Sequence, residues 1–310
     1  MNILITGAGG YIGRQLGERL AQTHNVIGVD LRAVNDLPFP VHAMDIRDAA
    51  IGELMKQQGI THVVHLAAVL EDSGDRARDY DIDVNGTRNV LEACVAAGVQ
   101  HITVTSSGAA YGYYADNPEW LRETDALRGN AEFAYADHKR QVEALLAEYR
   151  ERTPALQQLV LRVGTVLGAH TDNLITRLFQ RKRLLSIRGS ASPFVFIWDQ
   201  DLVSIIEQGV SGSRAGIYNV AGDGALGVYE LAHMLGKPVL SLPAWLLKTV
   251  LAIGHALRLT RYGPAQVNFL RYRPVLLNEK LKSEFGYQPR KSSRDAFEFY
   301  VAHARLRGML

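Results

Sequence analysis

The stretch "ILITGAGGYIGRQL" at residues 3–16 decides the fold, because an apolar run passes through a glycine-rich turn into an amphipathic helix. Gly7, Gly10 and Gly13 mark the turn. A phosphate reaches backbone N–H groups at a helix N-terminus only where no side chain intervenes, and the helix dipole favours its negative charge. A tight turn without a ligand could use the same residues, so the prediction of a dinucleotide site depends on what surrounds it.

Acidic residues end the next two predicted strands. Asp30 closes "NVIGVD", at the place where an acid accepts hydrogen bonds from an adenosine ribose. Asp45 ends the following strand and is expected to meet the adenine. Asp30 would repel a 2′-phosphate, which favours NAD over NADP, although Arg32 could pair with such a phosphate.

The first 170 residues alternate short β-branched runs with helical patterns, which is typical of a parallel sheet wrapped by helices. Near-continuous apolar runs such as "VVHLAA" and "LVLRV" indicate strands covered on both faces. We therefore predict an α/β fold with a Rossmann-type doubly wound parallel sheet. Residues 1–170 form the NAD(P)-binding domain in this prediction, and residues 171–310 form a smaller, mostly helical substrate-binding lobe interleaved with the core.

Composition limits the partners. The 310 residues carry a formal net charge of +2 and no block of five or more like charges, so nothing in the overall balance indicates a nucleic-acid or acidic-membrane partner. A small-molecule substrate is expected. Cys94 is the single cysteine, the N-terminus shows no signal-peptide pattern, and the histidines show no metal-ligand spacing. These features favour a cytoplasmic protein without a metal site.

The stretch "FAYADHKRQVEAL" carries a tyrosine, Tyr135, four residues before Lys139. Hydride transfer at a secondary alcohol carbon also moves a proton on its oxygen, so the site needs an acid/base. A free phenol has a pKa of about 10, and a lysine one helical turn away on the same face favours its ionised form. We predict Tyr135 as the acid/base and Lys139 as its electrostatic partner and a donor to the nicotinamide ribose. Thr105, Ser106 and Ser107, at the end of the preceding strand, supply candidate hydroxyls to orient the substrate oxygen.

Several ordered motifs together resemble the extended short-chain dehydrogenase/reductase family, which contains nucleotide-sugar epimerases, 3β-hydroxysteroid dehydrogenases and related reductases. Besides Asp30, the resemblance rests on "TGAGGYIG" (6–13), "HLAA" (65–68), "DVNGTRNV" (83–90), "TSSGAAYG" (105–112), "YADHK" (135–139), "LRVGTVLG" (161–168) and "FIWDQDLV" (196–203).

The resemblance implies a role for individual residues. Ser107, Tyr135 and Lys139 form the catalytic set, and the two hydroxyls before Ser107 touch the cofactor or cap the strand end. Asn85 either starts a helix or supports the site. The family also implies a homodimer through two helices, at about 84–98 and 134–151. The implied cofactor-binding residues are Gly7, Gly10, Tyr11, Ile12, Gly13, Asp30, Leu31, Arg32, Asp45, Ile46, Leu66, Ala67, Ala68, Asn85, Thr105, Ser106, Tyr135, Lys139 and Val163.

Two departures from the family pattern bear on the reaction. Sugar 4,6-dehydratases carry an Asp-Glu pair after the active hydroxyl, where this chain has Gly108 and Ala109, so elimination is disfavoured. Nucleotide-sugar epimerases carry an asparagine and an arginine where this chain has Thr165 and Phe194.

Losing that arginine weakens the case for a diphosphate-linked substrate, although Arg177 or Arg188 could replace it. We therefore favour an NAD(P)-dependent oxidoreductase that interconverts a secondary alcohol and a ketone. A nucleotide-sugar epimerase with tightly bound NAD is the alternative. A non-catalytic dinucleotide sensor is a third hypothesis.

One apolar stretch, "PAWLLKTVLAIGHALRLTR" at residues 243–261, is too short and too interrupted by charge to span a membrane. It could lie on a membrane surface. We favour instead a cover over the substrate pocket, roofed by Trp245, Leu246, Leu247 and Leu251, which suits a less polar substrate.

Overall fold

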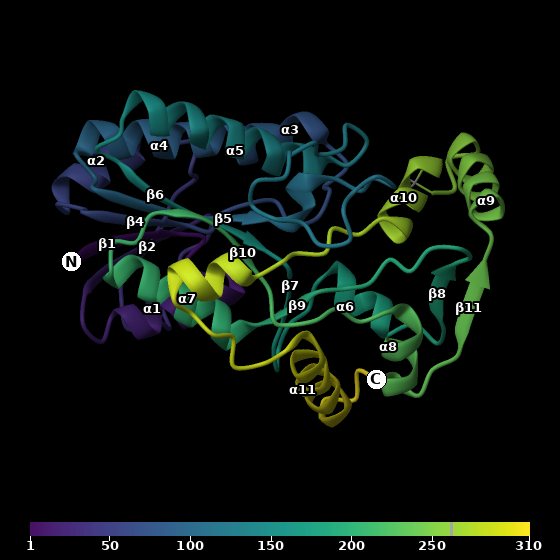
Figure 1. The fold of residues 1–310 in the computed structure, drawn as a ribbon. Helices are drawn as coiled ribbons and strands as arrows, with labels where there is room; N and C mark the ends of the chain where they lie inside the picture. The colour runs from purple at the N-terminus through teal and green to yellow at the C-terminus, as the bar shows by residue number, and fades with distance from the viewer. Residues whose placement is uncertain (261–262) are drawn as a thin grey trace. The chain divides into compact units, whose positions relative to one another are not determined.

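A computed structural model describes residues 1–260 and 263–310 and is built on a seven-stranded sheet (Figure 1). The strand order is β10-β6-β5-β4-β1-β2-β3, and the neighbours from β5 to β3 pair in parallel. The predicted Rossmann-type doubly wound fold is confirmed. The strands are β1 (Asn2–Thr6), β2 (Asn25–Asp30), β3 (Val41–Ala43), β4 (His62–His65), β5 (His101–Ser107), β6 (Gln157–Val163) and β10 (Gly216–Val220).

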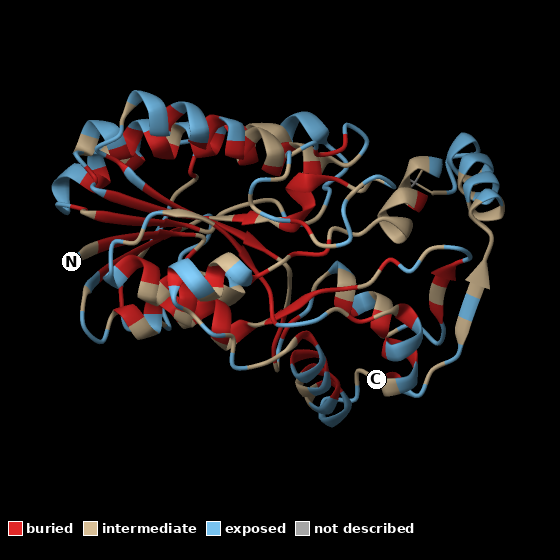
Figure 2. Ribbon diagram, viewed as in Figure 1, coloured by how far each residue is buried: buried red, intermediate tan, exposed pale blue. Residues whose placement is uncertain are grey.

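Helices cover both faces of this sheet, with α2, α4 and α5 on one face and α1 and α7 on the other (Figure 1). Because both faces are covered, the strand interiors are apolar and buried, as the red strands of Figure 2 show. The helices are α1 (Tyr11–Leu20), α2 (Ala50–Gln57), α3 (Arg76–Tyr80) with the π-helical turn η1 (Asp81–Asn85), α4 (Gly86–Ala97), α5 (Ala134–Arg152) and α7 (Asp199–Ser211).

The chain forms two compact units that interleave along the sequence. The first comprises Met1–Ser107, His138–Arg162 and Leu202–Tyr218, and the second comprises Gly108–Asp137, Val163–Asp201 and Asn219–Leu310. The predicted boundary at residue 170 remains a prediction. The second unit contains η2 (Gly108–Tyr111), β7 (Thr165–Leu167), α6 (Leu174–Phe179), β8 (Leu184–Ile187), β9 (Phe196–Trp198), α8 (Val228–Leu235), β11 (Val239–Leu242), α9 (Ala244–Ala256), η3 (Pro264–Gln266), α10 (Val267–Arg271), η4 (Leu281–Phe285) and α11 (Ser293–Leu306).

Aromatic side chains form the core of the second unit. The rings of Phe194 and Phe196 stack at 5.8 Å between centroids, and Phe179 meets Phe297 edge to face at 5.1 Å. These contacts hold α6 and α11 against the small parallel sheet of β7 and β9. Within the described residues, no helix combines the length and the hydropathy needed to cross a membrane.

The turn from β1 into α1 depends on backbone that only glycine allows. Gly7 has φ = 71°, and a Cβ there would lie 2.9 Å from the backbone N of Ala67. A Cβ on Gly13 would lie 2.2 Å from the carbonyl O of Gly7. Glycine at these two positions therefore lets α1 and the turn approach each other more closely than a residue with a side chain would allow. The strand order reverses between β1 and β4, where open α/β sheets bind ligands, so this turn stands at the expected site.

A buried ion pair fastens α5 to the sheet inside the first unit. Arg162 on β6 donates to both carboxylate oxygens of Glu143, with Nη2 2.7 Å from Oε2. Ser106 on β5 donates to Oε1 of the same carboxylate at 2.5 Å. Both charged side chains are 5% exposed, so each needs the other.

Replacing Arg162 with Met leaves the Glu143 carboxylate buried without its cation. We expect the free energy of unfolding to fall by about 3–5 kcal/mol, measured by urea denaturation. Arg152→Met is the control, because the Arg152–Glu148 pair is exposed to solvent and contributes under about 1 kcal/mol. Equal losses in the two variants would contradict the role assigned to the buried pair.

Gly13→Ala tests the close approach at the turn. We expect overpacking to lower stability by about 1–3 kcal/mol, seen as a lower melting temperature. The same change at Gly52 on α2 is the control, since its Cβ would meet Ala93 Cβ at an ordinary 3.6 Å and a helix gains about 1 kcal/mol from Gly to Ala. A Gly13→Ala protein as stable as wild type would show that the turn relaxes freely.

Candidate functional site

Asp30 lies at the C-terminal end of β2 and holds the glycine turn. Its Oδ2 accepts a hydrogen bond from the backbone N–H of Gly9 at 2.9 Å. Tyr11 and Ile12 follow in the first turn of α1, while Leu31 and Arg32 are exposed just beyond the strand. The first unit therefore brings together the predicted residues of the glycine turn and the predicted ribose acid.

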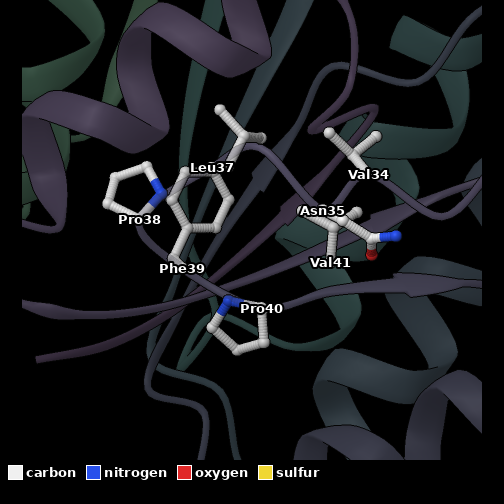
Figure 3. Close-up of a pocket in the computed structure, with 7 residues that line it drawn as sticks. All are labelled: Val34, Asn35, Leu37, Pro38, Phe39, Pro40 and Val41. Atoms are coloured by element: carbon white, nitrogen blue, oxygen red, sulfur yellow. The ribbon is translucent and has the colours of Figure 1, made fainter.

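A pocket of about 490 Å³ lies in the connection between β2 and β3 (Figure 3). It is formed within residues 34–41 and contains none of the predicted site residues. The Val34 side chain borders the glycine turn, because a Cβ on Gly9 would lie 2.9 Å from its Cγ2. The pocket is therefore next to the candidate cofactor site but outside the predicted chemistry.

Asp45 already has a strong partner, which the sequence did not indicate. Arg47 donates to Asp45 Oδ2 at 2.7 Å and to Asp81 Oδ2 at 2.8 Å, and Asn85 donates to Asp81 Oδ1 at 2.8 Å. The Arg47 guanidinium lowers the pKa of the Asp45 carboxyl below its ordinary value. The structure thus links Asp45 and Asn85, two predicted cofactor residues, through Arg47 and Asp81. Ile46 is buried in the core beside them.

His65, the last residue of β4, is a core histidine. Its Nδ1 lies 2.7 Å from Thr6 Oγ1, and its Nε2 lies 3.0 Å from Thr87 Oγ1. Burial lowers the pKa of His65 to about 3, so the ring is neutral and is no base near neutral pH. Leu66, Ala67 and Ala68 continue from this strand end toward the glycine turn, where the Ala67 backbone N closely faces Gly7.

Tyr135 and Lys139 lie one turn apart on α5. Lys139 is buried, and its Nζ donates to the backbone carbonyl O of Thr105 on β5 at 2.9 Å. This contact places the ammonium group at the C-terminal end of β5, where Ser107 is the last residue. The neighbouring Ser106 hydroxyl donates to buried Glu143, which favours a structural role for that side chain. Val163 likewise ends β6.

A second hydrogen-bonded pair positions α5. His138 Nδ1 lies 3.0 Å from Asp83 Oδ2, and Asp83 Oδ1 accepts the backbone N–H of Val69 at 2.7 Å. Among the described residues, no group of three or more His, Cys, Asp or Glu side chains is arranged to hold a metal ion.

An aromatic group in the second unit lies beside Tyr135 and was not foreseen. Tyr113 packs against Phe133 at 5.4 Å and Phe269 at 5.1 Å between ring centroids. Burial raises the pKa of Tyr113, and the nearby Tyr135 phenol adds to the shift. In the sequence, the only local indication of this aromatic group is Phe133, two residues before Tyr135 in "FAY".

Arg273 places a guanidinium against Phe194, the residue that stands where the family pattern has an arginine. Its guanidinium lies 3.8 Å over the centroid of the Phe194 ring, and Nη1 donates to the Oγ of Ser192 at 2.8 Å. Burial lowers its pKa to about 10. Within the described residues Arg273 Nε has no hydrogen-bond partner, and no carboxylate pairs with the side chain. Arg177, by contrast, pairs with Asp172 at 3.1 Å.

Gly108 and Ala109 are buried in the 3₁₀ turn η2. A Cβ on Gly108 would lie 3.0 Å from Leu276 Cδ2. A side chain at position 108 would therefore press on Leu276, and neither Gly108 nor Ala109 supplies the carboxylate that the resemblance assigns to dehydratases.

Comparison with known proteins identifies the family. The model of the NAD dependent epimerase/dehydratase family matches residues 3–219. A Mycobacterium tuberculosis protein named as uncharacterized is 26% identical over 315 residues, which cover 96% of this chain and 82% of that protein. The N-acetyl-alpha-D-glucosaminyl-diphospho-ditrans,octacis-undecaprenol 4-epimerase of Escherichia coli O157:H7 is 32% identical over 183 residues, 58% of this chain and 53% of that enzyme.

Among solved structures, the UDP-glucose 4-epimerase of Thermus thermophilus in complex with NAD is similar in fold, with a TM-score of 0.77. The two are 24% identical, and the match covers 98% of this chain and 99% of that one. The family match extends from β1 through most of β10 and includes the glycine turn, Asp30 and α5. The chain is therefore an enzyme of the NAD dependent epimerase/dehydratase family.

Proposed function

We propose that this enzyme interconverts a secondary alcohol and a ketone by hydride transfer with NAD, using Tyr135 as the acid/base. The observation that carries the proposal is the buried ammonium of Lys139, one turn from Tyr135 on α5 and hydrogen-bonded to the end of β5 at 2.9 Å. A positive charge at that place stabilises negative charge on the tyrosine oxygen. A lysine that only covered the surface of a helix would be exposed.

The residues of the first unit suit NAD as the cofactor. Close packing at Gly7 and Gly13 holds the glycine turn against the N-terminus of α1, where backbone N–H groups can bind a pyrophosphate. A carboxylate has two oxygens, so Asp30 can hold Gly9 through Oδ2 and accept a ribose hydroxyl through Oδ1. Its negative charge disfavours a 2′-phosphate, with exposed Arg32 as the residue that would favour NADP.

The chain's own residues would divide the chemistry among them. NAD, when bound, supplies the hydride acceptor or donor. Tyr135 takes the proton from the substrate hydroxyl or returns it to the carbonyl, Ser107 hydrogen-bonds the same oxygen, and Lys139 stabilises the charged tyrosine and binds the nicotinamide ribose. The missing carboxylates at Gly108 and Ala109 favour redox chemistry over elimination.

Epimerisation of a diphosphate-linked sugar is the second candidate, and Arg273 is the observation that favours it. A partly buried guanidinium without an anionic partner, in the same unit as Tyr135, suits a phosphate. The E. coli relative is named as an epimerase of a diphosphate-linked sugar. Such a reaction would oxidise a sugar carbon and return the hydride to its other face.

We also propose a cytoplasmic homodimer assembled through α4 and α5, the helices at about 84–98 and 134–151. Val95 supports this assembly, because it is an exposed apolar side chain on α4. The family resemblance supplies the rest of the argument.

Tyr135→Phe removes the acid/base hydroxyl and keeps the ring. We expect turnover to fall by about 10²–10⁴-fold, because proton transfer loses its catalyst. NADH consumption on adding a ketone reports net reduction, whereas interconversion of UDP-glucose and UDP-galactose without net change in NADH reports epimerisation. Tyr149→Phe on the same helix is the control and should keep full activity. A Tyr135→Phe enzyme within a few-fold of wild type would refute the assignment.

Arg273→Met distinguishes the two candidate reactions. If the substrate carries a diphosphate, losing a charge-assisted hydrogen bond of about 1.5–3 kcal/mol should weaken UDP-glucose binding roughly 10- to 150-fold by calorimetry with NAD present. Arg177→Met, which breaks an exposed pair, should leave the Kd unchanged. Unchanged binding in Arg273→Met would count against the epimerase reading and leave the alcohol dehydrogenase reading intact.

A further inference from the structure

Helix α9 is apolar and yet has no buried residue. Its sequence "AWLLKTVLAIGHA" would be expected to form a core contact. Instead Trp245 is 68% exposed, Val250 56% and Ile253 55%, and Leu257 just beyond the helix is 63% exposed. Figure 2 shows most of α9 in the pale blue of exposed residues. Contiguous exposed apolar surface of this kind marks an interaction site.

The exposed apolar residues share one side of the helix. At 100° per residue, Trp245, Val250, Ile253 and Leu257 fall within an arc of about 140°. Leu247 and Leu251, which are only partly exposed, fall outside that arc, whereas Leu246, also partly exposed, falls within it. Leu246, Leu247 and Leu251 are partly covered, and the expected cover over a substrate pocket remains a prediction. Trp245 is mostly exposed, so a pocket cover does not explain the side of α9 that carries Trp245, Val250 and Ile253.

Charge around α9 is strongly one-sided. Residues 231–278 contain six Lys or Arg and no Asp or Glu, although the formal net charge of the whole chain is only +2. Lys248 and Arg258 are both exposed, and neither forms an ion pair within the described residues. The small total charge therefore conceals a basic region centred on the exposed apolar helix.

We propose that α9 lies flat on the surface of an anionic lipid bilayer and attaches the enzyme to it as a peripheral protein. Thirteen helical residues span about 20 Å, too short to cross a hydrocarbon core of about 30 Å. An apolar side with flanking cations is the pattern of interfacial helices, and tryptophan is enriched at the level of the headgroups. Anionic headgroups supply the negative charge that this region lacks.

A second copy of the chain is a poorer occupant of the same surface. A two-fold symmetric contact places the same patch on both sides, and here each side would bring cations and no acids. Like charges would then meet across the interface without compensation. The bilayer has no such conflict. The inference is independent of the proposed chemistry, because attachment requires no active-site residue.

Flotation of the full-length protein with vesicles tests the proposal. We expect binding to vesicles of phosphatidylcholine mixed with phosphatidylglycerol, weaker binding to phosphatidylcholine alone, and weakening with salt. Lys248→Glu with Arg258→Glu should lower the affinity for the mixed vesicles by at least about 30-fold, at about 1 kcal/mol for each cation lost. Ile253→Glu with Leu257→Glu should abolish binding to both vesicle types. Leu306→Glu on α11 is the control, because Leu306 is an exposed apolar residue outside α9.

Two further measurements fix the outcome. Trp245 emission should shift to shorter wavelength on adding mixed vesicles, and the shift should be lost in Trp245→Phe. Light scattering without lipid should give the same mass for wild type and Ile253→Glu/Leu257→Glu. Failure to bind mixed vesicles at low salt would overturn the proposal, as would equal binding by the α9 variants and the control. A smaller mass for the α9 variant without vesicle binding would assign the surface to a second copy.

Discussion

The buried charges between α5 and the strands beneath it are the constraint on which the site depends. Lys139 and Glu143 follow Tyr135 at intervals of four residues, so the three share one face of α5. Lys139 is fixed to Thr105, and Glu143 is fixed to Arg162 and Ser106. Since a buried charge without its partner costs several kcal/mol, the helix cannot rotate or slide without breaking these contacts. The ion pair thereby fixes the angle at which the proposed acid/base is presented.

Local patterns in the sequence were enough to predict the fold and to select part of the candidate site. Strand alternation, the glycine turn and the Tyr135–Lys139 spacing each involve residues within about one turn or one strand, where backbone geometry relates sequence to space directly. The hydrogen bonds that join Asp45 to Asn85 through Arg47 and Asp81 could not be predicted in this way. These hydrogen bonds join separate segments of the chain, and a single sequence does not show which segments come into contact.

Phe194 shows that a residue missing from a sequence motif can have a counterpart nearby in the folded protein. Compared with the family pattern, position 194 lost an arginine, and the sequence alone therefore argued against a phosphate-bearing substrate. In the fold, Arg273 comes from a segment almost 80 residues later and stacks on the ring that replaced that arginine. The cation is absent from the motif and present in the second unit. A motif comparison tests chemistry only at aligned positions, whereas a ligand meets whatever side chains the fold brings together.

Arg273 and α9 are both departures from the rule that buried charge is paired and apolar surface is covered. Each departure identifies the missing partner by its chemistry. Arg273, whose Nε has no hydrogen-bond partner and which lies in the unit that holds Tyr135, would suit the oxyanion of the second proposed substrate class, a diphosphate-linked sugar. A solvent-exposed apolar helix in an acid-free segment calls for apolar material bordered by negative charge. The two requirements differ in scale. Arg273 would be satisfied by a single bound group, whereas α9 would need an extended surface. The proposed substrate and the proposed membrane contact can therefore be tested separately on the same protein.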